Sequence, residues 1–446
     1  MSQEARIDVE LSLKQDSEAP STEQAAEIAE TLSKGVWFST PSTVSAEGVQ
    51  APDEEWELVS DRPYLGRFAT GRAAVYYGAD HTGLVRPMIF ADGFNYGPSD
   101  LPGLWEHFNA PYPPLQERFL DQLLASGVDV VLLGFDVRHN YIQANAGVAV
   151  SCIHRAIQQR QGYAPLIVGG VSMGGIITRY ALATMERDGE DHQTETYLSY
   201  DSPHNGAWIP LILQQMAYFF EDFSSGDPGG PKQADLIRSA AAQQLLWGWV
   251  ENSRYSGPVA TASPLRGEFL AELKDLGWFP ARPRKLGVAN GTANGTGRDM
   301  PPGELVFDWK APLFIASATA RIQPAYGERQ RVGGMHFFPQ VRRTDTTAVP
   351  PFDGAPGGTL ASYGMIADAL KTKIEDRYRI GCFVPTVSAV ALNYDPVGWP
   401  IDLYTDVSAL SPEESALDDF QCDTENSGHS SVSQTLVEWI LAQITK

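Results

Sequence analysis

The feature that most constrains the fold is an alternation of short apolar runs with longer helical patterns in the first half of the chain. The run from Val128 to Asp136 is largely apolar and ends in a polar residue, which is typical of a parallel strand buried on both faces. Strands that alternate with helices predict an α/β fold, with a mostly parallel central sheet flanked by helices. The expected strands are 66–77, 85–91, 128–136, 166–170 and 196–200, and the expected helices are 115–126, 142–161 and 174–186.

The alternation breaks after residue 206, where a long apolar segment is followed by loops rich in glycine and proline. We interpret 207–310 as a helical cap or lid, inserted into a core formed by 36–206 and 311–446. Residues 1–35 carry an excess of acidic side chains, which predicts a flexible, solvated leader. Later in the chain we expect strands at 313–317 and 382–392, an antiparallel ribbon at 331–343 and a final amphipathic helix at 431–444.

The charge and composition of the chain narrow its partners. Its 33 Lys and Arg against 55 Asp and Glu give a formal charge of -22, which repels nucleic acid and anionic lipid surfaces. No secretory signal or membrane-spanning apolar run occurs, and the three cysteines form neither a disulfide framework nor a metal-ligand spacing, so we expect a cytoplasmic protein. Without a nucleotide fingerprint or a calcium loop, the sequence predicts no cofactor and no metal.

One motif in the chain carries chemistry. Gly170-Val-Ser-Met-Gly174 matches G-x-S-x-G, the nucleophile elbow, and it lies between an expected buried strand and an expected helix. Glycine at the two outer positions lets strand and helix approach closely while the turn holds the serine in a strained conformation. Ser172 is therefore the predicted nucleophile, with its hydroxyl at the carboxyl edge of the sheet.

Around this motif the chain resembles the α/β-hydrolase superfamily, and within it the bacterial lipases and esterases. One segment, Asp201-Ser-Pro-His-Asn-Gly-Ala207, resembles the small-Pro-His-x-Gly stretch that follows the sixth strand of many lipases. The resemblance implies an α/β-hydrolase fold and a catalytic order of serine, acid and histidine. It covers about residues 67–446 and rests on Phe90-Ala-Asp-Gly-Phe94, Gly170-Val-Ser-Met-Gly-Gly175, Asp201-Ser-Pro-His-Asn-Gly-Ala207 and Glu425-Asn-Ser-Gly-His429.

In this order the general base lies in a loop before the last helix, and His429 stands there. Two other histidines compete for the role. His204 belongs to the Pro-His-x-Gly stretch, where we expect it to hold a loop by hydrogen bonds, and His336 lies in the expected ribbon. His429 is the predicted base, which takes the serine proton during attack.

Two aspartates are candidates for the acid, which accepts the histidine Nδ1 proton and stabilises the imidazolium. In the lipases that the chain resembles, an Asp-Gly usually precedes a Val-Pro stretch, but here Gly381 and Cys382 stand at those positions. Asp201 directly follows an expected strand and matches an alternative placement known in some lipases. Asp402, 27 positions before His429, is the second candidate.

Attack on a carbonyl places negative charge on its oxygen, which N–H donors must stabilise. The residue after the nucleophile supplies one donor in this motif, which predicts the Met173 backbone N–H. The resemblance implies the Phe94 backbone N–H as the second donor, with Asp92 where related chains often carry histidine. The apolar run 211–220 and the tryptophans of the cap predict either an acyl pocket or the core of a helical subdomain.

These residues predict a serine hydrolase that cleaves carboxylic esters of small or lipid-like molecules through an acyl-enzyme on Ser172. Two alternatives stay open. An acyltransferase or cyclising thioesterase would pass the same acyl group to an alcohol or amine, and product analysis with an added nucleophile distinguishes it. A binding protein that keeps the fold without catalysis would fail to react with an active-site phosphonate.

Overall fold

The computed structural model describes residues 50–111, 117–221, 233–255, 261–311, 315–324, 329–346, 350–393 and 402–445, so the predicted leader at 1–35 lies outside the described residues. In the described part, eight strands form one central sheet in the order β1-β2-β4-β3-β5-β6-β7-β14. Two of them are antiparallel to their neighbours at one edge, β1 (Glu54–Val59) and β2 (Thr70–Tyr76). The parallel strands are β3 (Pro87–Ala91), β4 (Asp129–Phe135), β5 (Leu166–Val171), β6 (Thr194–Tyr200), β7 (Arg284–Thr292) and β14 (Asp419–Asp423). The predicted mostly parallel sheet is confirmed.

The register of the sheet brings the ends of neighbouring strands together. Ala91 at the end of β3 pairs with Gly170 of β5, and Val171 at the end of β5 pairs with Tyr200 at the end of β6. Tyr200 in turn pairs with Val288 of β7. The residues that follow these strands therefore meet at one carboxyl edge, which is where ligands bind in open parallel sheets.

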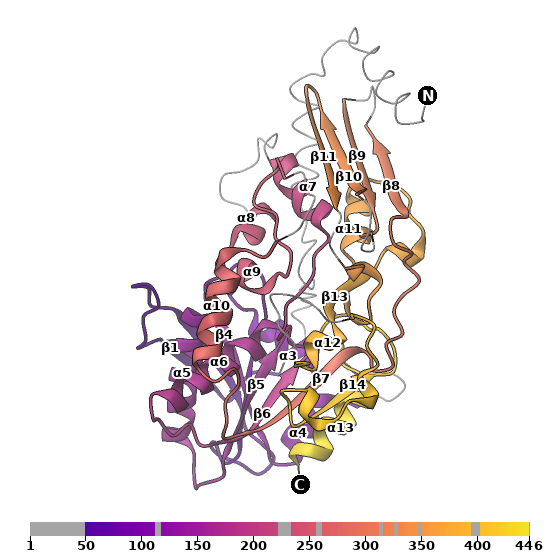
Figure 1. Ribbon diagram of the computed structural model, residues 1–446. Coiled ribbons are helices and arrows are strands. Elements are labelled where there is room, and N and C mark those ends of the chain that lie inside the picture. The colour runs from indigo at the N-terminus through magenta and orange to yellow at the C-terminus, as the bar shows by residue number, and fades with distance from the viewer. Residues whose placement is uncertain are drawn as a thin grey trace.

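Helices cover both faces of the sheet (Figure 1). Val131 and Leu133 of β4 pack into the apolar cluster on one face and Val130 and Leu132 into that on the other, because side chains alternate along a strand. On the first face lie α5 (Ile142–Gln159), α6 (Met173–Arg187) and α10 (Pro264–Asp275), and on the second α3 (Leu101–Phe108), α4 (Phe119–Ala125) and α13 (Gln434–Ile444). No helix in the described part of the chain combines the length and the apolarity that a bilayer crossing requires.

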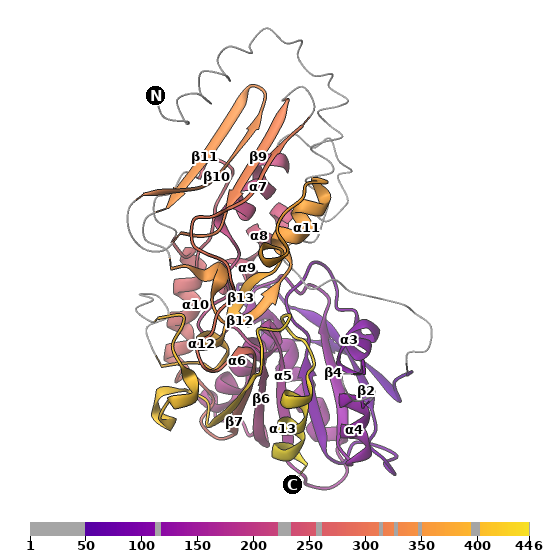
Figure 2. The same ribbon diagram turned by 90° about the vertical axis from the view of Figure 1, so that its right-hand side faces the viewer.

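A third apolar cluster forms a cap beyond the central sheet. Its centre is α7 (Leu211–Glu221), which packs against a four-stranded antiparallel sheet of order β11-β10-β9-β8 among the described residues. Figures 1 and 2 both show this sheet at the end of the molecule opposite α13. The cap comprises β8 (Leu305–Lys310), β9 (Ala316–Arg321), β10 (Gln330–Phe337), β11 (Gln340–Thr346), α8 (Gln233–Arg238) and α9 (Ala240–Leu245).

A small antiparallel sheet lies between the cap and the central sheet, formed by β12 (Gly357–Leu360) and β13 (Gly381–Pro385) (Figure 2). Pro385 ends β13 and begins the short helix α12 (Thr386–Ala389), so the strand predicted at 382–392 ends earlier than expected. A proline cannot donate to a strand ladder, but it is tolerated where a helix starts. The other described helices are α11 (Ser362–Ala369) and 3-10 turns at Phe352–Gly354, Asp376–Tyr378, Val407–Ala409 and Pro412–Glu414.

The observed cap differs from the predicted 207–310 insertion in two places. Strand β7 falls inside that range yet pairs with β6 and β14 in the central sheet. Its sequence, RKLGVANGT, is poor in β-branched residues, and it becomes a strand because its neighbours supply the hydrogen bonds. Strands β9, β10 and β11 lie in the predicted core range 311–446 but belong to the cap sheet, so the cap is not wholly helical. The expected ribbon at 331–343 corresponds to the hairpin of β10 and β11.

Candidate active site

Ser172 lies in the sharp turn between β5 and α6, with φ 54° and ψ -125°. This backbone conformation is strained for a residue with a side chain, and it is the signature of a nucleophile elbow. The turn is held by two hydrogen bonds, from Ser172 N–H to the Tyr200 carbonyl at 2.8 Å and from Gly175 N–H to the Ser172 carbonyl at 3.2 Å. Ser172 is 7% exposed, so its hydroxyl is sheltered from bulk water.

The glycines of the motif are required by close backbone contacts. A Cβ on Gly170 would lie 2.6 Å from the Gly174 carbonyl carbon, and one on Gly174 would lie 2.1 Å from the Ala91 carbonyl oxygen. Real Cβ atoms do not approach other atoms so closely. The elbow therefore packs strand β5, helix α6 and the end of β3 against one another, as the sequence motif requires.

Asp201 and His429 form a buried pair. The His429 Nδ1 atom lies 2.7 Å from the Asp201 Oδ2 atom, and Asp201 is fully buried directly after β6. The His429 Nε2 atom is buried and has no hydrogen-bond partner within the described residues. A histidine whose Nδ1 is bonded to a carboxylate and whose Nε2 is unpaired has the arrangement of a general base.

The structure separates the other candidate residues from this pair. Asp402 is exposed, and its Oδ1 accepts the Tyr404 backbone N–H at 2.9 Å, so it caps a turn. His204 is buried, with Nε2 2.8 Å from the Ser199 hydroxyl and Nδ1 3.4 Å from the Arg179 guanidinium. Burial, together with the charge of Arg179, holds the pKa of His204 well below its ordinary value. His336 lies half-buried in β10, in the cap sheet.

Several buried groups position the pair. The Asn290 backbone N–H, at the end of β7, donates to the Asp201 Oδ1 atom at 3.1 Å. The His429 backbone N–H donates to the Thr359 carbonyl of β12 at 2.8 Å. Gly358 packs so tightly that a Cβ there would lie 2.1 Å from the Asp201 Oδ2 atom. Strands β7 and β12 thus fix the acid from two sides.

The loop that carries His429 is fixed by side chains from three elements. The His107 Nε2–H donates to the Ser430 carbonyl at 2.7 Å, and burial lowers the pKa of His107. The Tyr200 hydroxyl and the Asn290 Nδ2–H both donate to the Ser431 carbonyl at 2.8 Å. These bonds link the loop to α3, β6 and β7.

The loop after β3 passes directly beside Ser172. A Cβ on Gly93 would lie 3.1 Å from the Ser172 Cβ. The Gly93 N–H is occupied, because it donates to the Asp92 Oδ1 atom at 2.7 Å. Burial raises the pKa of the Asp92 carboxyl, and the nearby Arg138 guanidinium opposes this rise. The next backbone N–H along the loop is that of Phe94.

Taken together, the strand order and the positions of three side chains decide the fold. The serine follows β5, the aspartate follows β6 and the histidine follows β14, the last strand of a sheet whose parallel strands alternate with helices. The chain has the α/β-hydrolase fold. The acid follows β6, and the end of β7 carries Asn290 instead.

The sequence matches no family model and no curated protein. Among solved structures, parts of this chain are similar to Est1E from Butyrivibrio proteoclasticus, with 16% identity, TM-score 0.24, and coverage of 33% of this chain and 50% of that one. They are also similar to the Bacillus licheniformis lipase BlEst2 in its propeptide form, with 17% identity, TM-score 0.31, and coverage of 50% and 40%. A Pyrobaculum calidifontis esterase matches with 11% identity, TM-score 0.27, and coverage of 59% and 79%. The chain thus spans half or less of the first two, and the fold assignment rests on its own topology.

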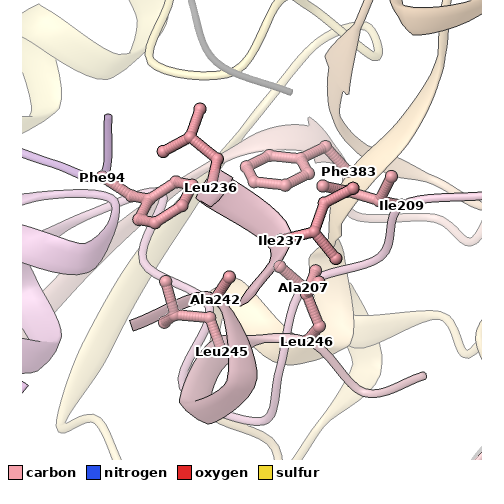
Figure 3. A pocket seen from close by; sticks show the side chains of 9 residues that line it. All are labelled: Phe94, Ala207, Ile209, Leu236, Ile237, Ala242, Leu245, Leu246 and Phe383. Carbon is pink, nitrogen blue, oxygen red and sulfur yellow. The ribbon is translucent and has the colours of Figure 1, made fainter. Parts of the chain in front are cut away.

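A pocket lies beside His429 of the pair. Its nine lining side chains are all apolar and converge from the core and the cap (Figure 3). Phe94 comes from the loop beside Ser172, and the ring of Phe383 lies 4.9 Å from the ring of His429 in an edge-to-face contact. The pocket is thus lined by one residue from the loop that passes Ser172 and by one residue in contact with His429. The other lining residues are Ala207, Ile209, Leu236, Ile237, Ala242, Leu245 and Leu246.

The apolar run 211–220 does not line this pocket. Its residues form α7, every one of them is buried, and they pack in the cap cluster. Of the two interpretations of this run, the structure favours the core of a subdomain. Sequence reasoning missed Asn290, Gly358 and Arg138. Asn290 was hidden because its strand was assigned to the cap, whereas Arg138 could have been found from its place after a parallel strand that neighbours β3.

Proposed function

We propose that this chain is a serine hydrolase that cleaves carboxylic esters with an apolar acyl group. The observation that carries the proposal is the buried Asp201–His429 contact of 2.7 Å, with the His429 Nε2 unpaired among the described residues. Phe383, whose ring contacts that of His429, lines an apolar pocket. Ser172 in its strained elbow supports the same reading. All nine lining residues of the pocket are apolar, which favours an acyl chain over a polar substrate group.

The proposed reaction has two halves. The Ser172 oxygen attacks the ester carbonyl while His429 Nε2 takes the hydroxyl proton, and Asp201 holds the ring and stabilises the imidazolium. The Met173 N–H, which no carbonyl of its own helix can accept, and the Phe94 N–H face the developing oxyanion. His429 then returns the proton to the leaving alcohol, which leaves an acyl-enzyme on Ser172. A water molecule, deprotonated by His429, then attacks the carbonyl of the acyl-enzyme. The carboxylic acid product leaves, and His429 returns the proton to the Ser172 oxygen.

The test is hydrolysis of p-nitrophenyl esters of increasing chain length by the wild type and three variants. We expect Ser172→Ala to lower kcat by about 10⁶-fold and Asp201→Asn by about 10⁴-fold, because loss of the nucleophile or of the correct histidine tautomer removes most of the catalysis. Asp402→Asn is the matched control, since Asp402 caps an exposed turn. Wild-type activity that survives Ser172→Ala would contradict the proposal.

A further inference from the structure

A buried ion pair lies next to the proposed oxyanion donors. The Arg138 Nη1 atom is 3.3 Å from the Asp92 Oδ2 atom, and both side chains are only about one-tenth exposed, at 10% and 11%. Asp92 also accepts hydrogen bonds from the Gly93 N–H and the Ser99 hydroxyl. Asp92 follows β3 and Arg138 follows β4, two neighbouring parallel strands, so the pair lies at the same edge as Ser172.

The guanidinium of Arg138 compensates the negative charge of the buried Asp92 carboxylate. Asp92 is two residues from Phe94, whose N–H is a proposed oxyanion donor, and a lone buried carboxylate there would repel the negative charge of the transition state. Such a carboxylate would also be costly to bury without a partner. The Arg138 guanidinium neutralises Asp92 at this point, and it has the fork of donors needed to make a second contact.

That second contact reaches the far side of the same loop. The Arg138 Nη2–H donates to the Tyr96 carbonyl at 3.1 Å, so one guanidinium bridges residues 92 and 96. The next residue, His139, accepts the Gly97 N–H at 3.3 Å and stacks on the Tyr96 ring, with ring centroids 4.8 Å apart. The segment after β4 therefore acts as a template for the shape of the 92–97 loop.

We propose that Asp92 and Arg138 are a positioning pair that fixes the 92–97 loop so that the Phe94 N–H faces the oxyanion. The Asp92 carboxylate accepts the hydrogen bond of the Gly93 N–H. Arg138 neutralises Asp92 and also donates to the Tyr96 carbonyl, so it links the two ends of the loop. This inference rests on the proposed function, since it assigns a role within the same reaction. The pair touches neither substrate nor reacting atoms; it acts through the loop.

The test compares four variants, Arg138→Met, Arg138→Lys, Asp92→Asn and the double variant Asp92→Asn/Arg138→Met, with the wild type on one p-nitrophenyl ester. We expect Arg138→Met to lower kcat by about 10- to 100-fold with KM changed less than about twofold, because the loop contributes only in the transition state. Arg138→Lys keeps the charge but not the bridge, and retains an intermediate kcat. The double variant loses no more than Arg138→Met, because the two residues act as a unit.

Arg284→Met is the matched control, because Arg284 forms an ion pair with Asp419 at 3.3 Å on the surface, with side-chain exposures of 47% and 43%. A kcat for Arg138→Met equal to that of Arg284→Met overturns the proposal, as does a loss confined to KM or additive losses in the double variant. Melting temperatures are measured for all variants. If Arg138→Met does not fold, Asp92→Asn and Arg138→Lys give the same comparison.

A second readout separates this proposal from the proposed function. A fluorophosphonate reacts with an activated serine and passes through its own oxyanion, so its labelling rate at Ser172 reports on the loop without ester turnover. If the wild type is labelled but cleaves no ester, the proposed function fails. The positioning role of Asp92 and Arg138 is then tested by whether Arg138→Met is labelled more slowly than Arg284→Met. A wild type that is not labelled at Ser172 overturns both proposals.

Discussion

Three residues at or next to the proposed site have strained backbone conformations, among nine such non-glycine residues in the described part of the chain. Ser172, Asp201 and Ser430 all have positive φ angles, of 54°, 47° and 68°, although none is a glycine. Such conformations cost about 1–3 kcal/mol each and persist only where surrounding structure enforces them. Here hydrogen bonds to Tyr200, Val288 and His107 do so. Ser172 and Asp201 directly follow β5 and β6, so at these two positions the strain occurs where the chain turns away from a strand.

A substitution at Gly358 tests the role of Asp201 without replacing any of the proposed catalytic residues. In Gly358→Ala the new methyl would lie 2.1 Å from the Asp201 Oδ2 atom, and Asp201 is fully buried and bonded on both oxygens, so it must shift relative to His429. A displacement of about 1 Å at such a contact costs about 100-fold in rate, so we expect kcat to fall by about that factor. Ester hydrolysis by purified variants is the measurement.

Gly267→Ala is the control for this substitution, because a Cβ on Gly267 in α10 meets nothing within 4 Å. It should retain wild-type kcat, with a slightly raised melting temperature. Equal kcat values for the two alanine variants would show that the Gly358 contact does not hold the acid.

At the scale of elements, the site depends on where the strands end. The serine, the aspartate and Asn290 follow or end β5, β6 and β7, which are neighbours in the sheet, and β12 contacts the pair from the side of the cap. Helices α8 and α9 supply four of the nine residues that line the pocket, Leu236, Ile237, Ala242 and Leu245, and a fifth, Leu246, directly follows α9. The core thus supplies the proposed chemistry, and the cap supplies most of the apolar wall.

Filling the pocket from α9 should change chain-length preference. Ala242 is 4% exposed and lines the pocket, so Ala242→Leu adds three carbons where an acyl chain would lie. We expect kcat/KM for octanoate esters to fall at least about tenfold relative to butyrate esters, since one methylene in a hydrophobic pocket changes selectivity by about 1–3 kcal/mol. The ratio of the two kcat/KM values is measured.

Ala240→Leu is the control in the same helix, because Ala240 is only partly buried and does not line the pocket. It should leave the octanoate to butyrate ratio unchanged. If Ala242→Leu leaves that ratio unchanged as well, the acyl chain binds elsewhere.

At the scale of the whole molecule, buried neutral histidines couple stability to pH. Burial holds the pKa of His204 well below about 6.5, so the ring stays neutral in the folded protein, while the unfolded chain takes up a proton below that pH. The folded state therefore binds fewer protons. The free energy of unfolding must fall as pH drops below about 6.5, by up to about 1.4 kcal/mol per pH unit for each such histidine.

We expect the melting temperature to fall between pH 7 and pH 5, and His204→Asn to show a shallower fall even though it is less stable at pH 7. Leu273→Ala is the control, because it removes a fully buried side chain of α10 without changing a titratable group. Its melting temperature should be lowered by a similar amount at each pH. A pH slope in His204→Asn as steep as in the wild type would assign the acid sensitivity to other groups.

The sequence predicted the sheet and the elbow through local patterns, and the resemblance to known hydrolases indicated His429 from its place before the last helix. Apolar runs specify buried strands, and the G-x-S-x-G spacing specifies a turn that only glycines can form, so both are readable from neighbouring residues. The sequence did not distinguish Asp201 from Asp402 as the carboxylate that contacts the histidine, because the residues around a carboxylate do not indicate which distant histidine it will contact. The structure brings Asp201 to His429 across 228 positions of sequence.

Contacts between segments far apart in the chain could be seen only in the tertiary structure. Strand β7 has no strong strand signal of its own and exists because β6 and β14 supply its hydrogen bonds, and Asn290 reaches the pair only through that strand. The pocket likewise joins residues from β13, from α8 and α9 and from the loop after β3. Patterns of period 2 or 3.6 record which face of an element is buried, but not which distant element covers it. The chain by itself determined the framework and the elbow at Ser172. Packing between distant segments decided which carboxylate meets His429, what supports that contact and which residues form the wall of the pocket.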